Sequence, residues 1–362
     1  MVKKFDEIFE DCTKYGVKIK TDEYQQSGKH LIIDQGQNQI AGYTDRTNGI
    51  FDNVPAIIFG DHTRIIKYVD QPFFLGADGT KILRSKCHDA NYKYLYYALT
   101  NSKIPDTGYN RHFKWLKEIQ IEYPDKKKQQ EIVEVLDKIN SILGYRQQQL
   151  AKLDELVKSR FIEMFGTEDE IDNWPCTTVG DVADVCVGVV IKPTQYYADN
   201  GVPAFRSLNI GEMKVKDADW VYFTEEGHQK NQKSVIRKND VLIVRSGAPG
   251  TACVATEKYD GYNAVDIIIA HPNNDRINSV FLAAYTNYPH GMNQIRSKTG
   301  GAAQQHFNVG GYKSLRLALP PMDLQNQFVT FVEQTKKSKS AIQQSLEKLE
   351  ILKKALMQHY FE

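Results

Sequence analysis

The chain has 362 residues, of which 41% are hydrophobic and 25% charged, and its formal net charge is +1. This composition is typical of a soluble globular protein with two or three domains. The near-neutral charge argues against a nonspecific nucleic-acid binder with a basic tail, although a site-specific binder with a local basic patch stays possible.

Several other classes of protein are also disfavoured. The five cysteines are scattered and form no C-x-x-C pair, so we expect neither a zinc site nor a disulfide framework, and a reducing cytoplasm is the simplest location. No signal peptide is expected, because Met1-Val-Lys-Lys-Phe-Asp-Glu turns acidic before any apolar run. The longest strongly apolar stretches, such as residues 265–270, are too short to span a membrane.

Two stretches of the chain predict globular α+β domains of similar plan, at residues 1–123 and 167–319. Short apolar runs bounded by Gly, Asp or Pro indicate the strands. In the first domain we expect strands at 29–34, 56–59, 63–69 and 119–123, and a helix at 92–99. In the second we expect strands at 202–205, 220–223, 241–244, 264–270 and 315–319, and a helix at 280–285.

Each predicted domain is followed by a long helix, at residues 124–166 and 320–362, and the two helices are copies of one sequence. Pro124 aligns without a gap on Pro320, Gln129 on Gln325, and Phe165 on Phe361. Such self-similarity indicates a repeated structural unit. Gly144 and Ser340 occupy equivalent positions, and the cost of a mid-helix Gly, roughly 1 kcal/mol against Ala, is tolerable if two backbones cross closely there.

Apolar residues in both helices alternate in steps of three and four, as in a coiled coil. The apolar pattern of the second copy is weakened by Thr335, Lys339 and Lys353. Each helix therefore needs a specific partner. The nearest partner is the other copy, in antiparallel pairing. The predicted seam consists of Ile132, Leu136, Ile139, Leu143, Leu150, Leu153, Val157, Phe328, Val332, Ile342, Leu346, Leu349 and Leu356.

Taken together, these blocks resemble the specificity (S) subunits of Type I restriction–modification systems. The resemblance rests on Pro320-Pro321 through Val329, on residues 152–166, and on the blocks 60–63, 179–182 and 245–250. It covers the whole chain and implies two target-recognition domains that each bind one half of a split DNA site. It also implies two methyltransferase subunits and restriction subunits as partners, with S-adenosylmethionine bound by the methyltransferases. The chain departs from the family at Lys126-Lys127-Lys128 and Leu324, where acidic residues are usual.

Residues for catalysis by the chain itself are not apparent. A base-flipping amino-methyltransferase would carry an N-P-P or D-P-P tetrapeptide, and Asn53-Val54-Pro55-Ala56 lacks its second proline and its aromatic residue. No G-x-G-x-x-G or phosphate-binding loop is present. Glu212-Met213-Lys214 has the spacing of a nuclease motif but no nearby P-D pair. We therefore expect a non-catalytic protein without its own cofactor or metal.

DNA reading requires polar side chains on loops that stand off a rigid sheet. Loops of the first domain offer the candidates Gln35, Asn38, Tyr43, Thr44, Arg46, His62, Thr63, Arg64, Lys81, Asn110, Arg111 and His112. Loops of the second offer Arg206, Ser207, Asn209, Arg245, Ser246, Lys298, Thr299, Gln304, Gln305 and His306. For each residue the competing interpretation is a solvated loop position, and for His112 and His306 it is also a buried structural role.

The sequence therefore predicts an α+β protein with two target-recognition domains, two long antiparallel coiled-coil helices and a pseudo-two-fold internal repeat. The expected function is to bind a bipartite double-stranded DNA site and to assemble methyltransferase and restriction subunits around it. A coiled-coil scaffold whose domains bind proteins is the alternative, and a complete restriction enzyme is a weaker third. The scaffold would need no methyltransferase partner, which distinguishes the first two.

Overall fold

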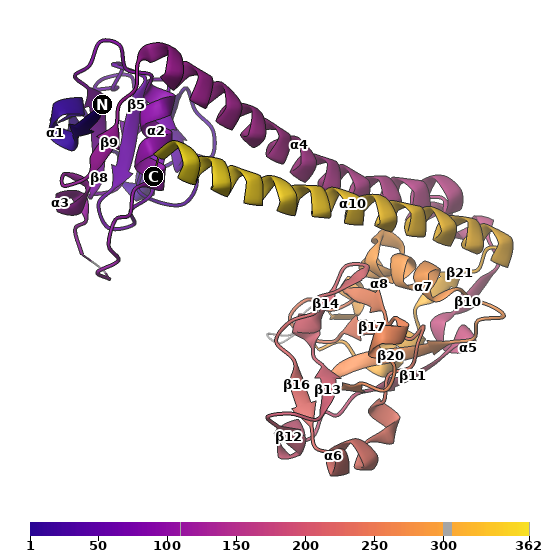
Figure 1. Ribbon diagram of the computed structural model, residues 1–362. Helices are drawn as coiled ribbons and strands as arrows, with labels where there is room; N and C mark the ends of the chain where they lie inside the picture. The colour runs from indigo at the N-terminus through magenta and orange to yellow at the C-terminus, as the bar shows by residue number, and fades with distance from the viewer. Residues whose placement is uncertain (109, 300–305, 362) are drawn as a thin grey trace. The chain divides into compact units, whose positions relative to one another are not determined.

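The computed structural model describes residues 1–108, 110–299 and 306–361 (Figure 1). The chain forms two compact units, and each contains one globular domain with parts of both long helices. Unit 1 comprises Met1–Gln147 and Gln343–Glu362, and unit 2 comprises Gln148–Ile342. We call residues 1–123 domain 1 and residues 167–319 domain 2, and describe each unit by itself.

Domain 1 consists of short strands around a four-stranded sheet. Its strands are β1 (Val2–Lys4), β2 (Phe9–Asp11), β3 (His30–Ile33), β4 (Gly42–Thr44), β5 (Ala56–Gly60), β6 (Ile66–Val69), β7 (Phe73–Leu75), β8 (Thr80–Ser85) and β9 (Gln120–Glu122). Its helices are α1 (Phe5–Ile8), α2 (Tyr92–Asn101) and α3 (Phe113–Leu116). The main sheet has the order β2-β8-β5-β6, and β4-β3-β7 and β1-β9 form two smaller sheets.

Domain 2 has the same kind of architecture with more elements. Its strands are β10 (Cys176–Thr178), β11 (Ala183–Val187), β12 (Tyr197–Ala198), β13 (Val202–Phe205), β14 (Ile210–Gly211), β15 (Lys214–Val215), β16 (Val221–Phe223), β17 (Val241–Val244), β18 (Ala252–Val254), β19 (Asn263–Ala264), β20 (Ile267–Pro272) and β21 (Arg316–Ala318). Its helices are α5 (Val179–Val182), α6 (Glu225–Lys230), α7 (Ser279–Asn287), α8 (Pro289–Thr299) and α9 (Val309–Lys313).

The strand orders show that the two domains share one topology. The main sheet of domain 2 has the order β11-β20-β17-β18, which matches β2-β8-β5-β6 element by element. The parallel pair β13 and β19 corresponds to the parallel pair β3 and β7, and the closing pair β10-β21 corresponds to β1-β9. The internal repeat of the sequence is therefore also a repeat of the fold.

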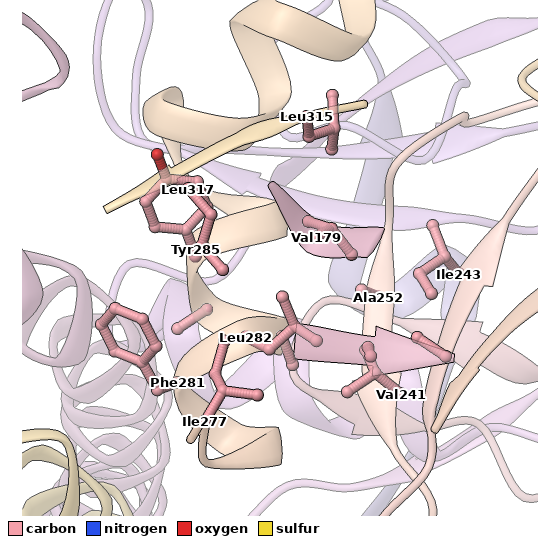
Figure 2. Close-up of a cluster of buried hydrophobic side chains, with 14 of the residues drawn as sticks. Val179, Val241, Ile243, Ala252, Ile277, Phe281, Leu282, Tyr285, Leu315 and Leu317 are labelled. Carbon is pink, nitrogen blue, oxygen red and sulfur yellow. The ribbon is translucent and has the colours of Figure 1, made fainter. Parts of the chain in front are cut away.

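Apolar, β-branched strand residues form the core of unit 2 together with α7. Figure 2 shows Val241 and Ile243 of β17 in one buried hydrophobic cluster with Phe281 and Leu282 of α7. Burial of each large apolar side chain contributes about 1.5–3 kcal/mol. The core extends into the long helices, because Phe161 stacks on Phe281 with ring centroids 5.6 Å apart.

The two long helices are α4 (Lys126–Phe165) and α10 (Met322–Phe361), each of 40 residues (Figure 1). Within unit 1 the start of α4 packs with the end of α10, since Ile132 and Met357 share one buried cluster. Within unit 2 the end of α4 packs with the start of α10, since the ring centroids of Phe161 and Phe328 lie 5.3 Å apart. The pairing is antiparallel in both units. Every residue of the predicted seam is buried or half-buried.

Three details differ from the sequence-based expectations. The predicted strand 63–69 begins only at Ile66, because Arg64 adopts φ +62° in a hairpin turn. The predicted strand 264–270 is two strands, β19 and β20, because Asp266 has φ +48° between them. No close backbone crossing occurs at Gly144, since a Cβ added there would meet nothing within 4 Å among the described residues.

Within the described ranges, no helix combines the length and apolarity needed to cross a membrane.

Candidate nucleic-acid interface

Three loops of domain 1 are joined around Gln35, which follows β3. Its Nε2 donates to Asp78 O in the β7–β8 turn at 2.8 Å, and its Oε1 accepts from His62 N in the β5–β6 hairpin at 3.2 Å. Thr63 Oγ1 donates to Gln35 O at 2.7 Å. Of the predicted candidates, the structure therefore brings Gln35, His62 and Thr63 together, with Thr63 exposed and the other two half-buried.

His112 belongs to the scaffold of this loop cluster and not to its surface. It is fully buried, and its backbone N–H donates to Asp61 O at 2.7 Å. Its Nδ1 also lies 3.0 Å from Asp61 O, which requires that this nitrogen carry the proton. Asp61 in turn accepts from Phe113 N at 2.7 Å and so holds the start of α3. The prediction of His112 as a direct DNA contact is wrong, because no DNA atom can reach its ring.

Two predicted basic contacts of domain 1 are held by carboxylates of the same domain. Arg64 Nη2 lies 2.7 Å from Asp106, and Lys81 Nζ lies 3.0 Å from Asp11. A backbone hydrogen bond from Gly108, followed by the charge of Arg64, lowers the pKa of Asp106 below its ordinary value. Both cations are partly exposed, so DNA would meet them as ion pairs and would have to displace the carboxylates to use their full charge.

The other candidates of domain 1 lie on separate loops. Asn38, Arg46, Asn110 and Arg111 are exposed, and Tyr43 is half-buried in β4. Thr44 is buried, and its Oγ1 accepts a hydrogen bond from Arg46 N at 3.2 Å. Thr44 is thus a turn-stabilising residue, and its prediction as a DNA contact is wrong because its side chain faces inward.

In domain 2, Arg245 connects three segments at the end of β17. Its Nη1 pairs with Asp266 at 2.7 Å, and its Nε donates to Phe307 O at 3.2 Å. Its carbonyl accepts from Phe307 N at 3.0 Å. The neighbouring Ser246 Oγ lies 2.7 Å from Nδ1 of the exposed His306. Arg245 therefore fixes this loop cluster, and Ser246 and His306 form its polar surface.

A second turn of domain 2 places Arg206 and Asn209 in different roles. Asn209 is fully buried at the end of η5 (Ser207–Asn209), where its Oδ1 accepts from Arg206 N at 2.9 Å and its Nδ2 donates to Ala218 O at 2.6 Å. The prediction of Asn209 as a base contact is wrong, because both ends of its amide are used inside the domain. Arg206 donates to Asp219 O at 2.6 Å, and Ser207 is half-buried beside it.

The remaining candidates of domain 2 lie at the end of α8. Lys298 is exposed, but Thr299 is buried, with its Oγ1 donating to Ile295 O at 3.0 Å. The prediction for Thr299 is therefore wrong, since its hydroxyl satisfies its own helix. Gln304 and Gln305 lie outside the described residues.

The two loop clusters are built in the same way on the two scaffolds. In each domain the residue after the central strand, Asp61 or Arg245, accepts a backbone hydrogen bond from the segment that leads to the closing strand. In each domain the turn after the parallel partner strand also joins the cluster, through Asp78 or Asp266. The residues after the central strands differ in charge, since Asp61 is an acid and Arg245 is a base, whereas Asp78 and Asp266 are both acids.

Sequence reasoning missed some residues that shape these clusters. Asp61 lies in the block 60–63 that carries the family resemblance but was not among the candidates, and Asp266 had no motif to mark it. Val190 and Ile191 were also missed, and both are exposed, Ile191 by 80%. Their loop lies next to the Arg245 cluster, because Val189 O accepts from Asp266 N at 3.1 Å. An apolar pair just before Lys192-Pro193 was the available signal.

Across the part of the chain that the structure describes, no group of three or more His, Cys, Asp or Glu residues is arranged to hold a metal ion. The fold and its loops thus define a protein with an internal repeat, in which two matching scaffolds carry different polar surfaces.

Comparisons with known proteins agree with this architecture. The family model described as the Type I restriction modification DNA specificity domain matches residues 1–155 and 171–351. The chain therefore belongs to this family. It is 26% identical over 254 residues to the specificity subunit of the Type I restriction enzyme EcoR124I/EcoR124II from Escherichia coli. That match covers 65% of this chain and spans only 61% of the relative's length.

Solved structures show the same fold at low sequence identity. The S subunit of a Type I restriction–modification system from M. genitalium has a TM-score of 0.59 and 16% identity, with 100% of this chain and 96% of that chain covered. A chain from a structure of complex assembly and conformational transition in the type I R-M system has a TM-score of 0.62 and 16% identity, with 100% and 97% covered.

Proposed function

We propose that this chain is the DNA-specificity subunit of a Type I restriction–modification complex. It binds a bipartite double-stranded DNA site, with one half-site bound by each domain. We infer that it is non-catalytic and that two methyltransferase subunits, which bind S-adenosylmethionine, modify adenine at the site. Restriction subunits complete the assembly. Family membership supports this function, and the presence of two similar domains supports the binding of one half-site by each.

The main support for the proposal is that the two domains share one scaffold but differ in the sequences of their loops. The main sheets have the same strand order, yet Asp61-His62 stands where domain 2 has Arg245-Ser246. A protein that reads two different base sequences needs this combination, since phosphate contacts position the domain and base contacts specify the sequence. A scaffold for two copies of one protein ligand would instead be expected to keep these loops alike.

The proposed DNA contacts are polar loop residues of the two domains, some within the two clusters and some on separate loops. In domain 1 we propose Thr63, Arg46, Asn110 and Arg111, which are exposed on loops. In domain 2 we propose Ser246 with the exposed residues His306 and Lys298. Hydroxyl, amide and imidazole groups hydrogen-bond base edges, whereas Lys and Arg bind phosphates or guanine.

The long helices are the proposed docking surface for the methyltransferase subunits. Leu156 of α4 and Leu352 of α10 occupy equivalent positions in the repeat, and they are 47% and 48% exposed. Two equal apolar positions on two copies of one helix suit two copies of one partner related by a pseudo-two-fold axis. The same repeat supports a stoichiometry of two methyltransferases to one specificity chain.

Co-expression with the methyltransferase subunit of a Type I restriction–modification system from the source organism tests this function. The purified complex should contain both proteins and should methylate a defined, two-part DNA sequence, which long-read sequencing of the host genome reveals. Removal of this chain should abolish all methylation at that sequence. Recovery of a stable complex that lacks a methyltransferase, or methylation that persists without this chain, would contradict the proposal and favour the scaffold alternative.

A further inference from the structure

Three side chains of domain 2 form a line across neighbouring strands, outside the proposed DNA interface. Cys186 lies on β11 and His271 on β20, while Asp240 immediately precedes β17. The β11–β20 register pairs Cys186 with Ile269 and Asp184 with His271, so Cys186 and His271 are diagonal neighbours on one face. The β17–β20 register pairs Val241 with Ala270, which brings Asp240 to the other side of His271.

The contacts have the order of a nucleophile, an imidazole and an orienting carboxylate. Cys186 Sγ lies 3.7 Å from His271 Nε2, and His271 Nδ1 lies 2.6 Å from Asp240 Oδ1. Asp240 is buried and is held by its own turn, since its Oδ2 accepts from Arg237 N at 2.6 Å. The carboxylate therefore fixes both the proton and the orientation of the ring, as the third group of a triad does.

The charge of the imidazole is also defined by these neighbours. The hydrogen bond with Asp240, and next the one with Cys186, raise the pKa of His271 to about 9. The ring is thus an imidazolium at neutral pH, with its second N–H directed at the sulfur. Cysteine attacks electrophiles as the thiolate, and a cation with an N–H directed at the sulfur is a feature of reactive cysteine sites.

The position of the sulfur limits the size of the reagent. Cys186 is half-buried, and its thiol lies 3.4 Å from Lys233 O in η6 (Gln232–Ser234). A small reagent can reach the sulfur because β11 is the edge strand of its sheet and Cys186 is only half-buried. Cys253 of the same domain is fully buried, and Cys176 is exposed.

We propose that Cys186 is a site of covalent thiol modification by small hydroperoxides, with His271 and Asp240 as its positioning residues. The thiolate sulfur attacks one peroxide oxygen, an S–O bond forms, and the O–O bond breaks. Cysteine is oxidised by two electrons to the sulfenic acid, and the peroxide is reduced. The attacked oxygen keeps its hydrogen, so the sulfenic acid S–OH forms directly. The leaving hydroxide, or the alkoxide of an alkyl hydroperoxide, takes a proton from the His271 imidazolium and departs as water or the alcohol.

The test compares cysteines within the full-length, reduced protein. Hydrogen peroxide is added at neutral pH, sulfenic acid is trapped with dimedone, and labelling is followed peptide by peptide by mass spectrometry. Cys186 should be labelled about tenfold faster than Cys176, although Cys176 is the more exposed. Because exposure alone predicts the reverse order, equal or slower labelling of Cys186 in the unaltered protein would overturn the proposal.

A variant distinguishes activation of the Cys186 sulfur by His271 from the solvent access of that sulfur. His271→Gln keeps a hydrogen-bond donor for Asp240 but removes the charge, and it should slow labelling of Cys186 about tenfold while leaving Cys176 unchanged. Continued protection of Cys253 from iodoacetamide shows that the domain is folded, and Cys186→Ser confirms the assignment of the labelled peptide. An unchanged Cys186 rate in folded His271→Gln would refute the role of the imidazolium. These readouts involve no DNA, so they stand apart from the proposed function.

Discussion

Gln129 and Gln325 make the same two hydrogen bonds in the two units. Gln129 donates to Pro124 O at 2.9 Å and accepts from Asn91 N at 2.9 Å, while Gln325 donates to Pro320 O at 2.9 Å and accepts from Asn278 N at 2.8 Å. Both glutamines are fully buried. Each joins the first turn of a long helix to the residue that caps α2 or α7, and so couples that helix to its domain.

Replacement of Gln129 by Leu should loosen unit 1 while leaving unit 2 intact. The change leaves the N–H of Asn91 and the C=O of Pro124, two half-buried residues, without their partner, which costs about 1–2 kcal/mol. Hydrogen exchange of the α2 amides, measured by mass spectrometry, should accelerate accordingly, while α7 keeps its wild-type rate. Gln325→Leu should produce the opposite pattern.

Gln148→Leu is the matched control for this experiment, because the same change then falls on an exposed position of the same helix. It should alter exchange by less than about 0.5 kcal/mol. Equal effects of Gln129→Leu on α2 and α7, or no effect on either, would show that the glutamine does not couple helix and domain.

The Gly144→Ala variant should be more stable than the natural protein. A Cβ at this mid-helix position meets nothing within 4 Å among the described residues, so only the helix propensity changes. Alanine should therefore stabilise α4 by about 0.5–1 kcal/mol, measured as slower hydrogen exchange of the surrounding helix. Gly60→Ala is the contrasting variant, because its Cβ would lie 2.2 Å from Thr63 Oγ1 and should destabilise domain 1. Destabilisation by Gly144→Ala would show that the position is crowded within the chain and would contradict this prediction.

The helices and strands with a strong hydrophobic pattern could be predicted from the sequence, and the short strands without such a pattern could not. The long helices and the strands β5 and β17 are marked by regular seams or by runs of β-branched residues. The edge strands β1, β10 and β19 have two or three residues and exist because a neighbouring strand pairs with them. Local sequence holds little information about such tertiary pairing.

For the candidate site, the sequence indicated the right loops but not the direction of each side chain. Thr63, Ser246 and His306 are polar loop residues that face outward or lie at the surface, whereas Asn209 and His112 are polar loop residues that face inward. Their residue types suit either role, since Asn and His hydrogen-bond backbone as readily as bases. The outcome depends on the backbone of distant segments, such as Ala218 and Asp61, which accept their hydrogen bonds.

The stability of unit 2 should fall as the pH rises from neutral toward 9. The pKa of His271 is raised from 6.5 to about 9 in the folded protein, so its contribution is complete below pH 6.5 and is lost as pH passes about 9. The loss should amount to about 1–3 kcal/mol, measured by hydrogen exchange of β17 and β20 at several pH values with correction for intrinsic rates. His271→Gln should flatten this dependence. If His271→Gln keeps the same dependence of stability on pH, other titratable groups cause that dependence.

Both long helices should act together as a ruler for the DNA spacer. Insertion of seven residues after Gln148 and after Gln344 preserves the seam register and lengthens each helix by about 10.5 Å. With roughly 3.4 Å per base pair, the preferred spacer should grow by about three base pairs, while both half-sequences stay the same. Methylation mapping of the engineered complex measures the new spacing.

A four-residue insertion at the same places is the control, since it shifts the seam register and locally unwinds the pair. It should reduce complex formation instead of shifting the spacer cleanly. An active seven-residue variant that still methylates the original spacing would show that the helices do not set the distance.

Exchange of domain 2 tests most directly whether the two domains read separate half-sites. Residues 167–319 are replaced by the corresponding domain of another family member with a different target, and genomic methylation is mapped by long-read sequencing. The account predicts a hybrid target in which one half-sequence is new and the other half is unchanged. A target that changes in both halves, or in neither, would contradict the central claim that each domain reads its own half of the site.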